Sequence, residues 1–272
     1  MFALIEPQQM IDKEGSMPAP VNELKRRLRA GEVLYGAWVG MADPYAAEMA
    51  GTSGFDWLLL DGEHAPNDMR SLSAQIGVLR VGPTQVVVRL VDDNPAKIKQ
   101  ALDIGAQSLL IPMIESGDQA RRVLRATRYA PEGMRGVGSS LARASMFSAI
   151  PDYLTTANAQ ICLILQVESR AGLAALDDIL AVDGVDAVFI GPSDLAADMG
   201  FLGQAGAVKA AVLDAIQRIR AAGLSAGVLT TDPDYIADCV AAGANFVGVG
   251  IDVLLYVEAM RQLAQRFKSP KS

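Results

Sequence analysis

The feature that most constrains this fold is a series of short, continuously apolar segments that alternate with longer amphipathic ones. Parallel strands covered on both faces have such continuous runs, whereas a strand with one wet face alternates apolar and polar residues. We therefore expect eight buried strands, over residues 34–39, 57–60, 85–90, 108–112, 161–167, 187–190, 226–229 and 246–249.

Helical segments lie between these strands. Asp43 before Pro44 and Asn94 before Pro95 each place a capping residue ahead of a proline at the first helical position. The expected helices cover residues 44–50, 68–80, 95–102, 118–128, 171–181, 208–222, 234–242 and 252–267. Eight such units predict an α/β protein with a single (β/α)8 TIM barrel over residues 21–272. An open doubly wound sheet uses the same units, but no Gly-x-Gly-x-x-Gly turn follows the first strand.

Two segments fall outside this rhythm. Residues 1–20 mix Pro, Gly, Gln and charges without periodicity, which predicts a disordered N-terminal extension. Residues 129–154 form a loop rich in Gly, Ser and Arg between the fourth helix and the fifth strand. Long irregular loops in compact domains are often functional. Because this one follows a helix, it must fold over the barrel or serve an interface to reach the catalytic end.

Charge and composition exclude several classes of partner. The net charge of −7 disfavours binding to nucleic acid and to anionic membranes. No apolar run reaches the roughly 18 residues that span a bilayer, and no secretory signal is visible, so we expect a cytoplasmic protein. Cys162 and Cys239 lie in apolar and Ala-rich runs and fit no metal motif, which predicts buried thiols.

Polar side chains follow several of the buried strands at the point where barrel enzymes keep their catalytic groups. These residues are Asp61, Glu63 and His64 after the second strand, Arg89 at the end of the third, Gln166 and Glu168 at the fifth, and Gly191, Pro192, Ser193 and Asp194 after the sixth. So many ionisable groups directly after buried strands indicate one functional rim.

Each of these groups has a functional and a structural interpretation. His64, the only histidine, suits proton transfer, and Asp61 is placed to orient it or to cap the loop. Glu168 and Asp194 offer oxygen ligands for Mg²⁺ or Mn²⁺, although each also precedes a helix that it could cap. A zinc site of nitrogen and sulfur ligands cannot be built from one histidine and two scattered cysteines.

Positive charge decides one mechanistic alternative. Arg89 ends an apolar strand and needs an anionic partner, either a substrate carboxylate or enolate, or a salt bridge to Asp61 or Glu63. None of the lysines lies at a strand end. A Schiff-base aldolase needs a lysine inside the barrel, so carbanion chemistry here must be stabilised by a metal. The free N–H groups of the helix opening at Gly191 are a weak candidate for holding a carboxylate.

Taken together, several segments closely resemble the class II, metal-dependent pyruvate aldolases of the 4-hydroxy-2-oxoheptanedioate aldolase (HpcH/HpaI) family. The similarity extends from about Leu24 to Phe267. The matching segments are residues 36–40, 54–66, 87–89, 128–145, 166–168 and 189–195. The resemblance implies an aldehyde-lyase that reversibly cleaves 4-hydroxy-2-oxo acids to pyruvate and an aldehyde, in aromatic compound catabolism, on a barrel with an exchanged C-terminal helix.

The resemblance also implies roles for single residues. Glu168 and Asp194 bind the divalent metal, Mg²⁺, Mn²⁺ or Co²⁺, which chelates pyruvate and stabilises its enolate. His64 assists proton transfer with support from Asp61 or Asp103, and Arg89 steadies the enolate. The residues implied to bind or line the substrate pocket are Trp38, Gln166, Gly191, Pro192, Ser193 and Leu229. The implied assembly is a homohexamer, a trimer of dimers.

Other functions remain open on the same residues. Related barrels cleave sugar acids of the 2-keto-3-deoxy-glucarate type or decarboxylate oxaloacetate, and Leu229 and the loop around Arg135 are expected to set the choice of aldehyde. A non-catalytic ligand-binding barrel would require the rim residues to be lost. A phosphosugar isomerase is disfavoured because the phosphate loops and a barrel lysine are absent.

Overall fold

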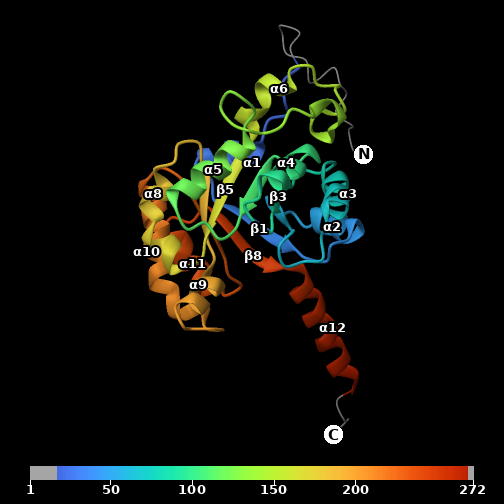
Figure 1. The fold of residues 1–272 in the computed structure, drawn as a ribbon. Helices are drawn as coiled ribbons and strands as arrows, with labels where there is room; N and C mark the ends of the chain where they lie inside the picture. The colour runs from blue at the N-terminus through green and yellow to red at the C-terminus, as the bar shows by residue number, and fades with distance from the viewer. Residues whose placement is uncertain (1–16, 269–272) are drawn as a thin grey trace.

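The computed structural model describes residues 17–268 and contains eight parallel strands in a closed barrel, in the order of the sequence (Figure 1). The strands are β1 (Leu34–Val39), β2 (Trp57–Asp61), β3 (Gln85–Arg89), β4 (Ser108–Ile111), β5 (Cys162–Val167), β6 (Ala187–Ile190), β7 (Ser225–Leu229) and β8 (Phe246–Ile251). Pairing of β1 with both β2 and β8 closes the barrel. The predicted (β/α)8 fold is confirmed.

Most of the helices surround the barrel and cover the outer face of the strands (Figure 1). The α-helices of residues 17–268 are α1 (Glu23–Arg29), α2 (Pro44–Gly51), α3 (Met69–Leu79), α4 (Pro95–Asp103), α5 (Gly117–Thr127), α6 (Tyr153–Thr156), α7 (Arg170–Ala174), α8 (Leu176–Leu180), α9 (Pro192–Asp198), α10 (Lys209–Ala221), α11 (Pro233–Ala241) and α12 (Asp252–Lys268). As predicted, the Asp43 and Asn94 side chains cap α2 and α4. No helix in the described part of the chain is both long and apolar enough to cross a bilayer.

Large aromatic side chains fill the interior of the barrel. The Trp57 and Phe246 rings stack with centroids 4.1 Å apart, and Trp38 packs edge-on against Trp57 at 5.8 Å. Glycine makes the room for this packing, since a Cβ on Gly36 would lie 2.1 Å from the Trp57 ring. Both cysteines are buried and unpaired, as the sequence predicts.

Helix α1, which the sequence analysis does not predict, closes the N-terminal end of the barrel. Leu24 and Leu28 are buried against the interior cluster. The Lys25 ammonium donates to the carbonyl of Ile161 at 2.6 Å and lies 3.2 Å from the Asp186 carboxylate. Burial lowers the pKa of Lys25, and the charge of Asp186 opposes that shift. The helix is therefore fixed to the barrel by both apolar packing and a buried charge pair.

The chain before α1 is partly described. Of the predicted N-terminal extension, residues 1–16 lie outside the described residues. The Met17 N–H donates to Asp152 at 3.0 Å and the Ala19 N–H to Thr156 at 2.8 Å. Ala19 is buried. The chain thus begins to pack before residue 21, earlier than the composition predicts.

The long loop before β5 lies at the N-terminal end of the barrel, where α6 is seen above α1 and α4 (Figure 1). The Arg135 guanidinium donates to Asp103 at 2.7 Å, and Arg143 donates to the carbonyl of Ser73 at 2.8 Å. The loop is therefore fixed to the middle of α3 and to the last residue of α4, away from the catalytic end of its own chain.

Helix α12 differs from the other long helices because it extends away from the barrel (Figure 1). It has no buried residue along its 17 residues. Its exposed large apolar side chains are Val253, Leu254, Leu255, Tyr256, Met260, Leu263 and Phe267.

Candidate active site

The candidate site lies at the carboxyl ends of the barrel strands. Asp61 and Arg89 are the last residues of β2 and β3, and Glu168 directly follows β5. Asp194 lies in the first turn of α9, which follows β6. The charges of Asp194 and Glu63 both act on the Glu168 carboxylate. The closed barrel thus brings together, at one rim, side chains that are far apart in the sequence.

A buried ion-pair cluster fixes Arg89. Its Nε donates to Asp61 Oδ1 at 2.9 Å and its Nη2 to Asp61 Oδ2 at 2.6 Å, a bidentate arrangement. Its Nη1 lies 2.9 Å from Glu63 Oε2. The guanidinium carbon lies 5.8 Å from the centroid of the Trp38 ring. The predicted salt bridges are formed, and further N–H hydrogens on Nη1 and Nη2 are left for a ligand.

Asp61 organises the loop after β2 as well as Arg89. Its Oδ1 accepts the backbone N–H of Glu63 at 2.9 Å and that of His64 at 3.3 Å. Burial opposes ionisation, but the hydrogen bonds and charge of Arg89 bring the pKa of Asp61 below its ordinary value. The predicted orienting contact is therefore made to the main chain of His64 and not to its imidazole ring.

Glu63 joins the two parts of this cluster. The His64 Nε2 atom lies 3.6 Å from Glu63 Oε2, and the His64 side chain is 67% exposed. Burial raises the pKa of Glu63 although the charge of Arg89 opposes the shift. From the sequence, the role expected of Glu63 is that of a partner for Arg89. Its position between Asp61 and His64 in the sequence already indicates that it could contact His64 as well as Arg89.

Glu168 is the most buried carboxylate of the site, with 3% of its surface exposed. Burial, reinforced by the charges of Asp194 and Glu63, raises the pKa of Glu168 to about 7. The Met113 N–H donates to Oε1 at 2.9 Å, and the Gln166 amide donates to Oε2. A Cβ on Gly191 would lie 2.6 Å from Glu168 Oε2, so glycine is required against this carboxylate.

Glu168 and Asp194 are not used as helix caps, so this alternative interpretation is wrong. Ser169 caps α7, and no side chain caps α9. Across residues 17–268, no group of three or more His, Cys, Asp or Glu residues is placed to hold a metal. Two carboxylates with repelling charges fit a hard divalent cation that keeps water and substrate among its ligands. They are the residues of this site that could hold one.

The predicted pocket residues lie in or directly after β1, β5, β6 and β7 and differ in burial. Trp38 is buried and packs against Phe189 at 5.5 Å, so it forms the floor of the site. The Gln166 Oε1 atom is buried and accepts no hydrogen bond from any described residue. Pro192 is the first residue of α9, and Ser193 is exposed in its first turn. Leu229 ends β7 and packs on the interior cluster.

Asp103 lies away from this site. It ends α4 at the N-terminal end of the barrel, where it binds Arg135. The expectation that Asp103 supports His64 is therefore not met within one chain. The Arg135 side chain is fully buried, with its guanidinium carbon 4.4 Å from the centroid of the Tyr129 ring. Strand order alone could not place Asp103, because the residue belongs to the end of a helix.

Comparison with known proteins gives consistent matches along the chain. Residues 34–259 match the family described as HpcH/HpaI aldolase/citrate lyase. A hydroxypyruvate/pyruvate aldolase of Roseovarius nubinhibens is 56% identical over 255 residues, covering 93% of this chain and 99% of that protein. A 2-keto-3-deoxy-L-rhamnonate aldolase of Escherichia coli O157:H7 is 50% identical over 253 residues, covering 92% and 95% of the two chains. A crystal structure of an HpcH/HpaI aldolase/citrate lyase family protein from Burkholderia cenocepacia J2315 superposes with a TM-score of 0.85 at 39% identity, covering 92% and 100%.

The buried Glu168 carboxyl predicts a specific dependence of stability on pH in the metal-free protein. Its pKa is raised from 4.5 to about 7, so the folded state holds a proton that the unfolded chain has released. This contribution to stability is fully present below the pKa that Glu168 has in the unfolded chain. It is lost as the pH rises through the pKa that Glu168 has in the folded protein. Between about pH 5 and about pH 8, Glu168→Gln should therefore lose less free energy of unfolding than the wild type, by about 2–3 kcal/mol.

Urea unfolding at the two pH values measures this difference. Glu48→Gln, at an exposed position on α2, is the matched control and should keep the wild-type pH dependence. An identical pH dependence in Glu168→Gln and the wild type would contradict the assignment of a raised pKa to Glu168.

Proposed function

Because the chain belongs to the HpcH/HpaI aldolase/citrate lyase family, we propose that its strand-end cluster reversibly cleaves 4-hydroxy-2-oxo acids to pyruvate and an aldehyde. The observation that carries the proposal is that two carboxylates without a cation and a fixed guanidinium lie at one rim. The buried Glu168 lies beside Asp194, and Arg89 is held by Asp61 and Glu63. Such a rim can bind a 2-oxo acid and neutralise the enolate that its cleavage leaves.

The chemistry requires charge neutralisation where the enolate develops. A divalent cation, Mg²⁺, Mn²⁺ or Co²⁺, held by Glu168 and Asp194 would supply Lewis-acid charge to the oxygens of the 2-oxo acid. Arg89 offers its remaining N–H hydrogens to the same developing anion. Its bidentate contact with Asp61 fixes the guanidinium before the substrate arrives, so no reorganisation is needed at the moment of reaction.

Bond cleavage needs a base for the hydroxyl proton on carbon 4. The exposed His64 is placed to accept this proton, with Glu63 beside its Nε2 atom to stabilise the imidazolium. The bond between carbons 3 and 4 then breaks, carbon 4 becomes the aldehyde carbonyl, and the electron pair remains as the enolate. Protonation of carbon 3 gives pyruvate, and the reverse sequence forms the new bond.

Substrate orientation is assigned to groups that still have hydrogen-bonding capacity. No side chain caps the first turn of α9, so the backbone N–H groups near Ser193 can hold the substrate carboxylate. Gly191 allows this turn to approach Glu168 closely. Leu229 and Trp38 provide the apolar side of the pocket.

A second substrate class has specific support. The aldolase from Escherichia coli is named for a 2-keto-3-deoxy sugar acid and is 50% identical to this chain. The relative from Roseovarius is named for hydroxypyruvate and pyruvate. Both names are compatible with a pyruvate-type enolate, so cleavage of sugar-derived 2-oxo acids belongs to the same proposal. A cytoplasmic location, as the sequence predicts, fits either substrate class.

We also propose that the protein acts as a homohexamer, a trimer of dimers in which α12 packs on a neighbouring chain. The helix buries no residue in its own chain and presents a large apolar surface. The loop carrying Arg135 lies at the end of the barrel opposite the site, so it can influence the choice of aldehyde only in a neighbouring chain. A second copy is thus the partner that fits both features.

Removal of divalent metal tests the proposed chemistry directly. Pyruvate release from racemic 4-hydroxy-2-oxo acids and from 2-keto-3-deoxy sugar acids should disappear after EDTA treatment and return when Mn²⁺ or Mg²⁺ is added. A lactate dehydrogenase coupled assay measures the product, with coupling-enzyme activity checked separately in each buffer. No release from any of these acids or from oxaloacetate, with any metal, would refute the proposed reaction.

Substitution of Arg89 tests its role in stabilising the enolate. Arg89→Lys keeps the charge but cannot reproduce the bidentate contact with Asp61. We expect kcat to fall by about 100-fold or more, which is the loss typical of an oxyanion-stabilising donor. Steady-state kinetics on samples shown to be folded by circular dichroism measure the effect. Arg122→Lys, at an exposed position on α5, is the control. Full activity of Arg89→Lys would limit Arg89 to a structural role.

The proposed assembly predicts a mass six times that of the 28.7 kDa chain. Tyr256 and Leu263 are seven residues apart on α12, so they share one helix face. The Tyr256→Asp/Leu263→Asp variant should dissociate, whereas a control with the exposed Gln262→Asp should not. Light scattering after size-exclusion chromatography measures the masses. A wild-type protein of single-chain mass would rule out the assembly.

A further inference from the structure

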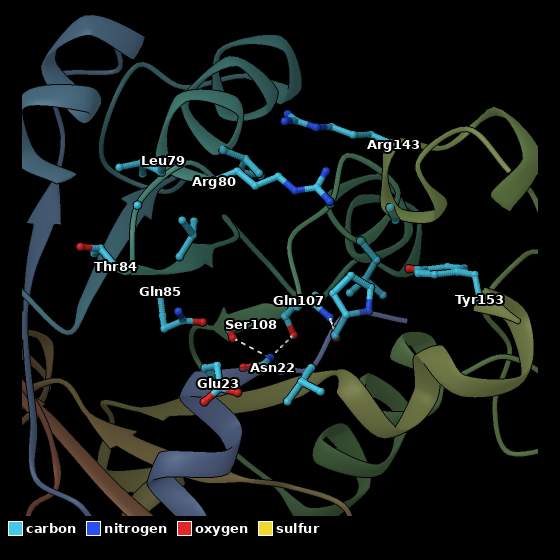
Figure 2. A pocket seen from close by; sticks show the side chains of 18 residues that line it. Asn22, Glu23, Leu79, Arg80, Thr84, Gln85, Gln107, Ser108, Arg143 and Tyr153 are labelled. Atoms are coloured by element: carbon cyan, nitrogen blue, oxygen red, sulfur yellow. Dashed lines mark hydrogen bonds between the residues drawn. The ribbon is translucent and has the colours of Figure 1, made fainter. Parts of the chain in front are cut away.

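A separate cavity of about 290 Å³ opens at the N-terminal end of the barrel. It lies between the end of α3, the start of β3 and β4, the segment before α1, and the loop carrying Arg143 (Figure 2). Gln85 opens β3 at this cavity, whereas Arg89 ends the same strand at the candidate active site. The cavity is therefore distinct from the catalytic rim and lies at the other end of the barrel.

Two arginines extend over this cavity from opposite sides. Arg80 comes from the end of α3 and Arg143 from the loop, so their side chains run past each other above the opening (Figure 2). Arg143 Nη1 donates to the carbonyl of Ser73 at 2.8 Å, and its other N–H groups have no described partner. Within residues 17–268, the Arg80 side chain forms neither an ion pair nor a hydrogen bond, although its backbone N–H donates to Ile76.

The cavity is positive although the whole chain is acidic. Glu23 is the carboxylate in the lining, and its Oε2 already accepts from Arg26 Nε at 2.7 Å. Burial, and then the like charge of Arg80, lower the pKa of Arg143. Two guanidinium groups are thus held near each other without a described counter-ion in a protein of net charge −7. A bound anion would relieve this repulsion.

The polar groups of the cavity floor are already satisfied. Asn22 Nδ2 donates to Ser108 Oγ at 3.0 Å and to the carbonyl of Gln107 at 3.2 Å (Figure 2). It also donates to the carbonyl of Gln160 at 3.1 Å. The Asn22 amide is thus already held by the protein, whereas most N–H groups of the two arginines have no described partner. The volume of the cavity is near the lower end of the range for small-molecule sites, roughly 300–1,000 Å³. The space suits a small ligand better than a nucleotide.

We propose that this cavity is a binding site for a small oxyanion, a phosphate or carboxylate group held between Arg80 and Arg143. Guanidinium groups bind such anions through paired, charge-assisted hydrogen bonds. The two arginines come from different elements, so an anion bound between them connects the end of α3 to the loop before β5. The site needs neither a metal nor the catalytic residues.

Isothermal titration calorimetry of the full chain with inorganic phosphate, at constant ionic strength, tests the site. We expect saturable binding that Arg80→Gln and Arg143→Gln each weaken by about tenfold or more, as loss of a charge-assisted hydrogen bond does. Arg122→Gln, which removes the same charge from α5, should bind like the wild type. The Arg80 side chain has no described hydrogen bond or ion pair to lose, so its variant separates binding from folding.

Parallel titrations with glycerol 3-phosphate and with succinate identify the source of the anion. If one or both phosphate compounds bind and succinate does not, the site is a phosphate site. If succinate binds and neither phosphate compound does, it is a carboxylate site. If none of the three binds, the proposal is wrong. It is also wrong if binding is unchanged in Arg80→Gln and Arg143→Gln, or is weakened equally in Arg122→Gln, because the anion then lies elsewhere or responds only to net charge.

Discussion

Closure of the barrel through the pairing of β1 with β8 is the constraint on which the other features depend. Once the strands form a closed ring, their carboxyl ends must share one rim, and Asp61, Arg89, Glu168 and Asp194 meet there. The ring also has an interior of fixed width. Gly36 provides the space for Trp57, and the aromatic cluster so formed supports Trp38 beneath Arg89.

Charge at this rim is unevenly compensated. Arg89 neutralises Asp61 through a bidentate contact and also contacts Glu63, so one guanidinium is shared between two carboxylates. Glu168 has only neutral hydrogen-bond donors around it, and its pKa rises to about 7. The rim thus has one side where a guanidinium is already fixed among carboxylates, and another side where the carboxylates lack a cation. This asymmetry suits a substrate anion on one side and a divalent metal on the other.

Strand positions could be predicted from sequence because burial on both faces leaves a continuous apolar run. The run over residues 34–39 coincides with β1, and the active-site residues at strand ends follow from it. Contacts between side chains could not be predicted in the same way. Which of two carboxylates binds Arg89, or whether Asp61 reaches the ring or the main chain of His64, depends on strand register and loop conformation. Asp103 lies at the opposite end of its own chain from His64, so the supporting role that the resemblance implies for it stays a prediction.

The buried ammonium of Lys25 has a consequence for how the chain reaches this structure during synthesis. Helix α1 is made early, but the carbonyl that binds Lys25 lies 136 residues later, and the Asp186 carboxylate later still. At translation rates of about 5–20 residues per second, α1 waits roughly ten to thirty seconds for these partners. During this interval an unpaired ammonium would be costly to bury, so α1 stays undocked and the N-terminal end of the barrel remains open. Helix α1 can therefore close the N-terminal end of the barrel only after β5 and β6 have been synthesised.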